Sequence, residues 1–248
     1  TSGSQNIIIS QGSGANITIA PGDVKAVYLD GAGSGAAVVD AFTSLSVGAL
    51  NGIKSKTFGT DSFMIGDNAT GTIDAADQNT GVGVDVFAAL TTGDRNSAFG
   101  YRALYSNTTG SFNTALGRTA LENNTSADGN TSVGVASLSQ NTTGADNAAL
   151  GYLALNLNTT GPRNTAVGKS SLAANTTGQN NTAVGYNSLL VNTTGAENTA
   201  VGVAALDANT TGANNTAVGR AALGANTTAS DNTAAGYQAL TSNTTAGN

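Results

Sequence analysis

The residues of this 248-residue chain best suited to contact a ligand form one regularly spaced column. Each member follows a glycine, and the column accepts tyrosine, charged residues and valine, which is typical of a solvent-facing position. Tyrosine and cationic side chains at such positions can contact a glycan, and the alternative is a simple solvated edge. The candidate ligand-binding residues are Tyr101, Arg118, Tyr152, Lys169, Tyr186, Arg220 and Tyr237, and valine occupies the column at Val84, Val135 and Val203.

Composition removes most catalytic chemistry. Histidine and cysteine are absent, which excludes imidazole acid–base catalysis, thiolate nucleophiles, disulfides and the usual zinc sites. Fifteen acidic residues are scattered without the spacing of a calcium loop. Asp74 and Asp77 form the one close pair in the less regular region, and a solvated turn explains them better than a hydrolase site. We therefore expect no catalytic residue, metal or cofactor, and no enzyme.

Charge and hydropathy limit the partners. The net charge is −6 and no cluster of lysine and arginine occurs, so we expect no nucleic-acid partner. No run of about 18 apolar residues is present, so we expect no membrane insertion.

A strict 17-residue period must position the candidate residues. Such self-similarity indicates a repeat architecture, in which each unit packs on its neighbours. Because glycine tolerates positive φ, we expect it to form the bend within each unit. The ten structural glycines are Gly83, Gly100, Gly117, Gly134, Gly151, Gly168, Gly185, Gly202, Gly219 and Gly236.

The unit 181–197 shows the elements expected in each repeat. Two short apolar stretches are separated by glycine and by Asn-Thr-Thr-Gly, which leaves no room for a helix of average length. We predict strands over Thr182–Val184 and Ser188–Leu190, with Val191 as the alternative end of the second, and a return turn over residues 192–195. The fold class is then all-β, a parallel β-solenoid with 17-residue coils.

The size of the side chains in each column predicts which face points inward. Val184 and Leu189 represent columns of large apolar residues, which we expect to fill the coil. Ala183 and Ser188 represent small columns, which we expect to face outward and allow another subunit to approach. One coil buries too little to offset its ordering entropy alone, so we expect a symmetric homo-oligomer, with a three-fold bundle as the simplest form.

Two features of the Asn-Thr-Thr turns have competing interpretations. The tripeptide is formally a glycosylation sequon, but stacked asparagines are better explained as hydrogen-bonded ladders. Repeated threonines also suggest an ice-binding face. Thr193 and Thr194 are adjacent in a turn, however, so at most one of them can point outward in a given row, which makes ice binding a minor alternative.

The sequence Asn-Thr-Ala-Val-Gly at 181–185 resembles the head repeat of YadA-type trimeric autotransporter adhesins. That resemblance implies a left-handed parallel β-roll with three chains side by side, although those repeats are typically shorter than 17 residues. The longer Asn-Thr-Thr-Gly turn is similar to repeats in phage tail fibres. Segments 16–30 and 31–42 also look like tail-fibre sequence.

Three regions follow from these patterns. Residues 1–50 are expected to form an attachment or trimerisation segment, with strands over 6–10, 16–20 and 25–29 and a short helix over 36–45. Residues 51–78 form a transition with a degenerate coil starting near Ser62, and residues 79–248 form ten coils.

The resemblance implies a structural fibre protein of the virion, the shaft or distal receptor-facing part of a phage tail fibre used for host attachment. Its partners would be two further copies, other tail or fibre proteins, and a host-surface glycan or protein receptor. The alternative is the head of a bacterial trimeric autotransporter adhesin at the cell surface.

Overall fold

The computed structural model describes residues 76–244 continuously and six short strands before them, and the chain divides into two units, 1–55 and 56–248. In the first unit, β1 (Ile7–Ile9) pairs antiparallel with β2 (Ile17–Ile19), and β3 (Val27–Leu29) pairs antiparallel with β4 (Val38–Asp40). The three strands expected there are confirmed.

The helix expected over residues 36–45 is wrong where the structure describes it. Strand β4 occupies Val38–Asp40, in register with β3 through Tyr28 and Val39. Consecutive β-branched residues favour an extended backbone over a helix, and pairing with β3 satisfies its hydrogen bonds. The other residues of the expected helix lie outside the described residues.

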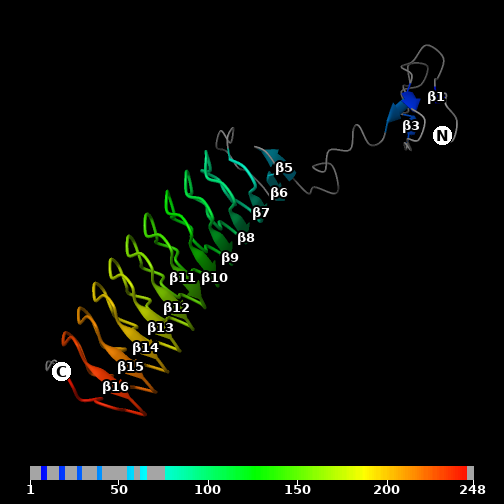
Figure 1. Ribbon diagram of the computed structural model, residues 1–248. Helices are drawn as coiled ribbons and strands as arrows, with labels where there is room; N and C mark the ends of the chain where they lie inside the picture. The colour runs from blue at the N-terminus through cyan, green and yellow to red at the C-terminus, as the bar shows by residue number, and fades with distance from the viewer. Residues whose placement is uncertain are drawn as a thin grey trace. The chain divides into compact units, whose positions relative to one another are not determined.

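The second unit contains one twelve-stranded sheet in sequence order, from β5 to β16 (Figure 1). Strands β6 to β16 pair in parallel, and every register that is described aligns residues one coil apart, as in Thr182 with Thr199. Strand β6 begins at Ser62, where a degenerate coil is expected, and most of that coil lies outside the described residues. The predicted parallel β-solenoid of 17-residue coils is confirmed. Its strands are β5 (Ser55–Phe58), β6 (Ser62–Ile65), β7 (Thr80–Val82), β8 (Ser97–Phe99), β9 (Thr114–Leu116), β10 (Thr131–Val133), β11 (Ala148–Leu150), β12 (Thr165–Val167), β13 (Thr182–Val184), β14 (Thr199–Val201), β15 (Thr216–Val218) and β16 (Thr233–Ala235).

The second strand of each coil, predicted over Ser188–Leu190, is wrong because this stretch is a succession of turns. Ser188 N–H donates to the Gly185 carbonyl at 3.4 Å, and Asn192 N–H donates to the Leu189 carbonyl at 3.3 Å. Leu189 itself has a φ of 49°, in the left-handed region. That conformation costs about 1–2 kcal/mol for an ordinary residue, so packing and hydrogen bonding must hold it.

Besides its buried asparagines, the narrow interior of each coil holds one strand residue and two turn residues. In the coil of β13 these are Ala183, Ser188 and Leu189, each fully buried. The first coil replaces this trio by Gly81, Val86 and Phe87, and a Cβ on Gly81 would lie 2.9 Å from Val86 Cγ1. Smaller and larger side chains thus compensate within a fixed volume, as close packing requires.

The expected orientation of the strand is therefore reversed. The small Ala183 and Ser188 columns line the interior, so the argument that they await another subunit fails, while the Leu189 column is buried as predicted. Val184 and its counterparts point outward instead, with Leu150 50% and Val201 37% exposed. The reason is geometric: only the central residue of a three-residue strand points inward, and the turn supplies the large side chain.

The glycine bend is confirmed as a position that excludes side chains. Gly185 has a φ of 135°, and a Cβ there would lie 2.4 Å from the Gly202 carbonyl oxygen of the next coil. Neighbouring bends therefore stack backbone on backbone, which fixes the residue after each glycine relative to its counterparts.

Matched substitutions in β14 test the inward face. We expect Ala200→Leu to lower the free energy of unfolding by about 1–3 kcal/mol, because it overfills a closed interior. Val201→Leu should change it by at most about 0.5 kcal/mol, because leucine already occupies the same column at Leu116 and Leu150. Denaturant unfolding followed by circular dichroism measures both, and a larger loss for Val201→Leu would contradict this orientation.

Candidate functional site

The residues that follow the repeat glycines form one file along the bends, here called the bend ridge. Its members are Val84, Tyr101, Arg118, Val135, Tyr152, Lys169, Tyr186, Val203, Arg220 and Tyr237, and all ten are exposed. The sequence prediction that this column faces solvent is confirmed. Whether it binds a ligand stays a prediction.

Backbone hydrogen bonds hold the bend ridge in register. The carbonyl of Tyr152 accepts from Ser170 N–H at 2.9 Å, and the carbonyl of Arg220 accepts from Gln238 N–H at 2.9 Å. The donor in each case lies one position after the ridge, one coil further on, with a left-handed φ near 55°. The side chains therefore project from a rigid backbone at one coil spacing, about 4.8 Å.

Each cation of the bend ridge lies beside a tyrosine of an adjacent coil. The Arg118 guanidinium is 5.9 Å from the centre of the Tyr101 ring, and the Arg220 guanidinium is 5.6 Å from that of Tyr237. The ammonium of Lys169 lies between two rings, 5.9 Å from Tyr152 and 5.7 Å from Tyr186. These separations are typical of cation–π contacts, worth about 0.5–1 kcal/mol at exposed sites.

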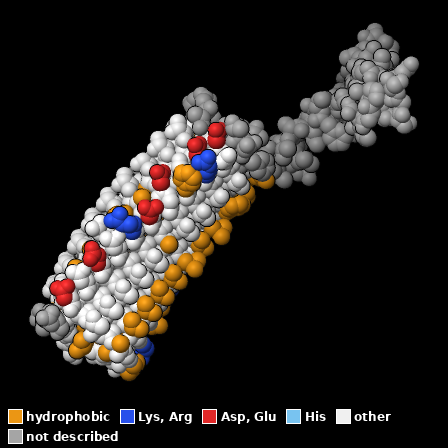
Figure 2. All heavy atoms as spheres, viewed as in Figure 1, with side chains coloured by type: hydrophobic (Ala, Val, Ile, Leu, Met, Phe, Trp, Pro, Cys, Tyr) orange, Lys and Arg blue, Asp and Glu red, His pale blue; other side chains and the backbone are white. Residues whose placement is uncertain are grey.

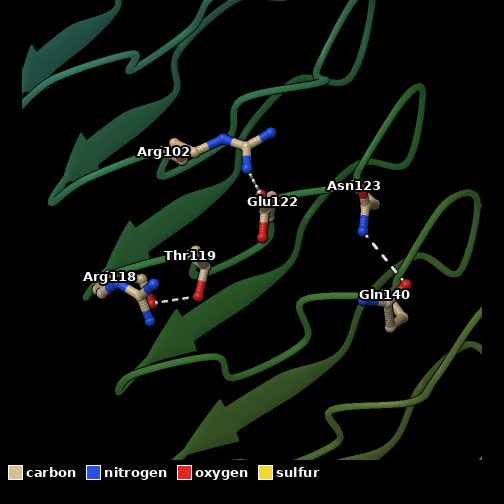
Figure 3. A network of polar contacts seen from close by, with 6 residues as sticks. All are labelled: Arg102, Arg118, Thr119, Glu122, Asn123 and Gln140. Atoms are coloured by element: carbon tan, nitrogen blue, oxygen red, sulfur yellow. Dashed lines mark hydrogen bonds and ion pairs between the residues drawn. The ribbon is translucent and has the colours of Figure 1, made fainter.

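A fourth cation beside the ridge is neutralised. The Arg102 guanidinium contacts the Glu122 carboxylate at 2.7 Å and lies 4.1 Å from the Tyr105 ring. Figure 3 shows Arg102 reaching toward Glu122, whereas at Arg118 the hydrogen bond drawn joins the Thr119 hydroxyl to the backbone carbonyl, at 2.7 Å. In the described part of the chain, Arg102 with Glu122 is the ion pair that forms, so Arg118, Lys169 and Arg220 keep their charge available.

Acidic side chains gather at the other end of the strand, where the return turn leads into β7 to β16. Figure 2 shows such a row, with a few basic side chains among the acids. The acids of this turn are Asp77, Asp94, Asp128, Asp146, Glu197 and Asp231, and the bases are Arg95 and Arg163. Elsewhere, burial raises the pKa of Asp207, although hydrogen bonds from its own and Ala208 backbone N–H groups oppose this. The two ends of each strand thus differ in charge.

Two buried asparagine ladders run through the stack, as the sequence predicted. Asn192 Nδ2 donates to Asn175 Oδ1 of the preceding coil at 2.9 Å and to the Gly195 carbonyl at 2.9 Å. In the other ladder, Asn198 N–H donates to Asn181 Oδ1 at 3.0 Å. Because the side chains of the Asn192 column are fully buried from Asn107 to Asn226, these asparagines are structural and closed to glycosylation in the folded chain.

The paired threonines of the turn split between two roles. Thr193 is half-buried and its hydroxyl donates to the Thr210 carbonyl of the next coil at 3.1 Å, whereas Thr194 is exposed. The expectation that only one of them points outward is confirmed. A second outward file of threonines lies on the strands, as at Thr182 and Thr199.

Sequence reasoning missed one exposed surface, because it placed the third residue of each strand in the coil interior. The third residue of each strand forms an outward line of apolar side chains, here called the apolar file, which is visible along the rod in Figure 2. A usable signal was present, because this column varies in size whereas the buried ones hardly do. Its members are Val82, Phe99, Leu116, Val133, Leu150, Val167, Val184, Val201 and Val218.

Within the described residues, no group of three or more histidine, cysteine, aspartate or glutamate side chains is placed to share a metal ion. The same part of the chain has no helix with the length and hydropathy needed to cross a bilayer.

Comparison of the chain with protein-family models, with curated proteins and with solved structures found no match.

Proposed function

We propose that this chain is a structural rod of an attachment fibre, in which a stiff β-solenoid carries surface-binding groups along the bend ridge. One observation carries the proposal: among the described residues, the bend ridge presents aromatic, cationic and aliphatic side chains at exposed positions that recur in every coil. Ten coils at about 4.8 Å give a rod of roughly 50 Å. Binding is then distributed over many weak contacts that act together.

Within this class, we favour the shaft or distal part of a phage tail fibre, located on the virion and without enzymatic activity. Support comes from the resemblance of the Asn-Thr-Thr-Gly turn and of segments 16–42 to tail-fibre sequence. The second candidate is the head of a trimeric autotransporter adhesin, supported by the Asn-Thr-Ala-Val-Gly strand motif. Ice binding has weaker support, because each outward threonine file is one residue wide and the strand file runs beside bulky Val, Leu and Phe side chains.

Immunogold labelling with an antibody against this chain separates the two candidates. The tail-fibre proposal predicts label on the appendages of phage particles, and purified chain should bind intact host cells and reduce phage adsorption. Label confined to the bacterial envelope would favour the adhesin. If the purified chain binds neither the host cells of the phage nor the target cells of the bacterium that displays it, attachment is contradicted as the function.

We propose that the fibre is a homotrimer. The support comes from the apolar file, because the small Ala183 and Ser188 columns lie inside the coil and cannot contact another subunit. Its nine half-exposed side chains offer on the order of 500 Å² of apolar surface, as large as the patches that mark protein interfaces. A second copy of this chain is the partner that fits, because only a surface with the same coil spacing can contact every member of the file.

Light scattering tests the assembly, with an expected mass three times the 24.2 kDa of one chain. Replacing Leu116, Leu150 and Val201 by glutamate should reduce the mass to that of one chain while the circular dichroism spectrum is retained, because these side chains face outward. Thr194→Glu, also outward but distant from the apolar file in the coil, is the control. A wild-type mass of 24.2 kDa would contradict this proposal.

A further inference from the structure

We propose that the bend ridge binds a linear acidic polysaccharide that lies parallel to the rod, an inference that rests on the proposed attachment function and specifies its ligand. The three available cations of the ridge, Arg118, Lys169 and Arg220, recur at intervals of three coils. At about 4.8 Å per coil, their charges are about 14 Å apart. The ridge therefore presents a sparse, evenly spaced line of positive charge.

The charge of the bend ridge is positive, opposite in sign to the net charge of the chain. The net charge is −6, yet none of the ten ridge residues is acidic. Of the nine acids in the described residues 76–244, six lie in the turns at the other end of the strand, Glu122 is paired with Arg102, and Asp85 and Asp207 lie at other positions of the coil. A polymer with negative charges is thus attracted to one bend and repelled by the other.

The tyrosines supply the second part of the recognition. Each cation contacts one or two tyrosine rings, at 5.6–5.9 Å, which limits its side-chain motion before a ligand binds. Arg220 also donates to the Tyr237 hydroxyl at 3.2 Å. Aromatic faces pack against the apolar faces of sugar rings, while guanidinium and ammonium groups bind carboxylate or sulfate. Each cluster can therefore contact one acidic sugar and its neighbour.

The spacing of the cations and the backbone hydrogen bonds of the ridge argue against other linear polyanions as the ligand. A nucleic-acid strand carries a phosphate about every 3.4 Å, so most of its charges would lie unpaired beside an acidic protein. An acidic peptide that added as a strand would need free backbone acceptors, but the carbonyls of ridge residues such as Tyr152 and Arg220 already accept from the next coil. A polysaccharide with one acidic group per repeating unit of a few sugars matches both constraints.

The wide separation of the three cations predicts that they act independently of one another. About 14 Å exceeds the Debye length of roughly 8 Å at physiological ionic strength, so each cation acts as an independent weak site. A polymer that reaches all three gains affinity by multivalency, and a short fragment that reaches one does not.

The test uses the full chain in its native assembly and affinity electrophoresis in gels containing hyaluronan, which has one carboxylate per disaccharide, or neutral dextran. We expect hyaluronan to retard the chain and dextran not to. The variant R118Q/K169Q/R220Q should lose at least tenfold in affinity for hyaluronan, and R118K/K169R/R220K should retain binding. The matched control R95Q/R163Q removes cations from the opposite turns and should bind like wild type.

The proposal is overturned if the glutamine variant binds hyaluronan as tightly as wild type or if dextran retards the chain equally. It is also overturned if a single-stranded oligonucleotide binds the same cations as tightly, since that indicates general anion attraction. Wild type that binds host cells but not hyaluronan refutes this ligand class and leaves the attachment function standing. Wild type that binds hyaluronan through the ridge but no cell refutes the attachment function alone.

Discussion

Hydrogen bonding between successive coils is the interaction on which the rest of the molecule depends. Each coil encloses a few side chains only, so it has no core large enough to fold by itself. Buried asparagines resolve this by bonding across coils: Asn192 donates to Asn175 of the preceding coil and accepts from Asn209 of the next coil at 2.8 Å. Replacing such an asparagine by alanine would leave its buried partners unpaired, at a cost of about 1–3 kcal/mol each. The period is thus fixed by the need to satisfy identical groups in every coil.

The narrow interior has a second consequence for the surface. Because two small residues and a leucine fill most coils, the third residue of the strand faces outward and belongs to the apolar file. The bend glycines stack too closely for any side chain, whereas the residues that follow them, such as Tyr186, project outward and vary in type. Sequence variability and surface position therefore coincide for a physical reason, and that coincidence supports attachment as the function.

Much of this architecture could be predicted from the sequence, because the 17-residue period and the breakers Gly185 and Asn192–Gly195 determine where strands and turns occur. The exposed ridge and the buried asparagine ladders were also predictable, since tolerance of mixed side chains indicates solvent and invariance indicates a shared internal environment. The second strand was not, because it required foreseeing that Leu189 adopts a left-handed φ of 49°. Alternation alone could not orient β13 either, since it specifies that Ala183 and Val184 face opposite ways without saying which faces inward.

The proposed attachment function depends on even spacing, because a rigid stack places one column of the sequence along a line at constant intervals. The most direct test is the distance between spin labels on that line, and the absence of native cysteine makes labelling specific. Val84 and Val203 are seven coils apart, and Val135 and Val203 are four. With labelled chain diluted in unlabelled chain, pulsed electron resonance should give narrow distributions near about 34 Å and about 19 Å. Broad distributions, or distances that do not scale with the number of coils, would contradict the rigid ridge.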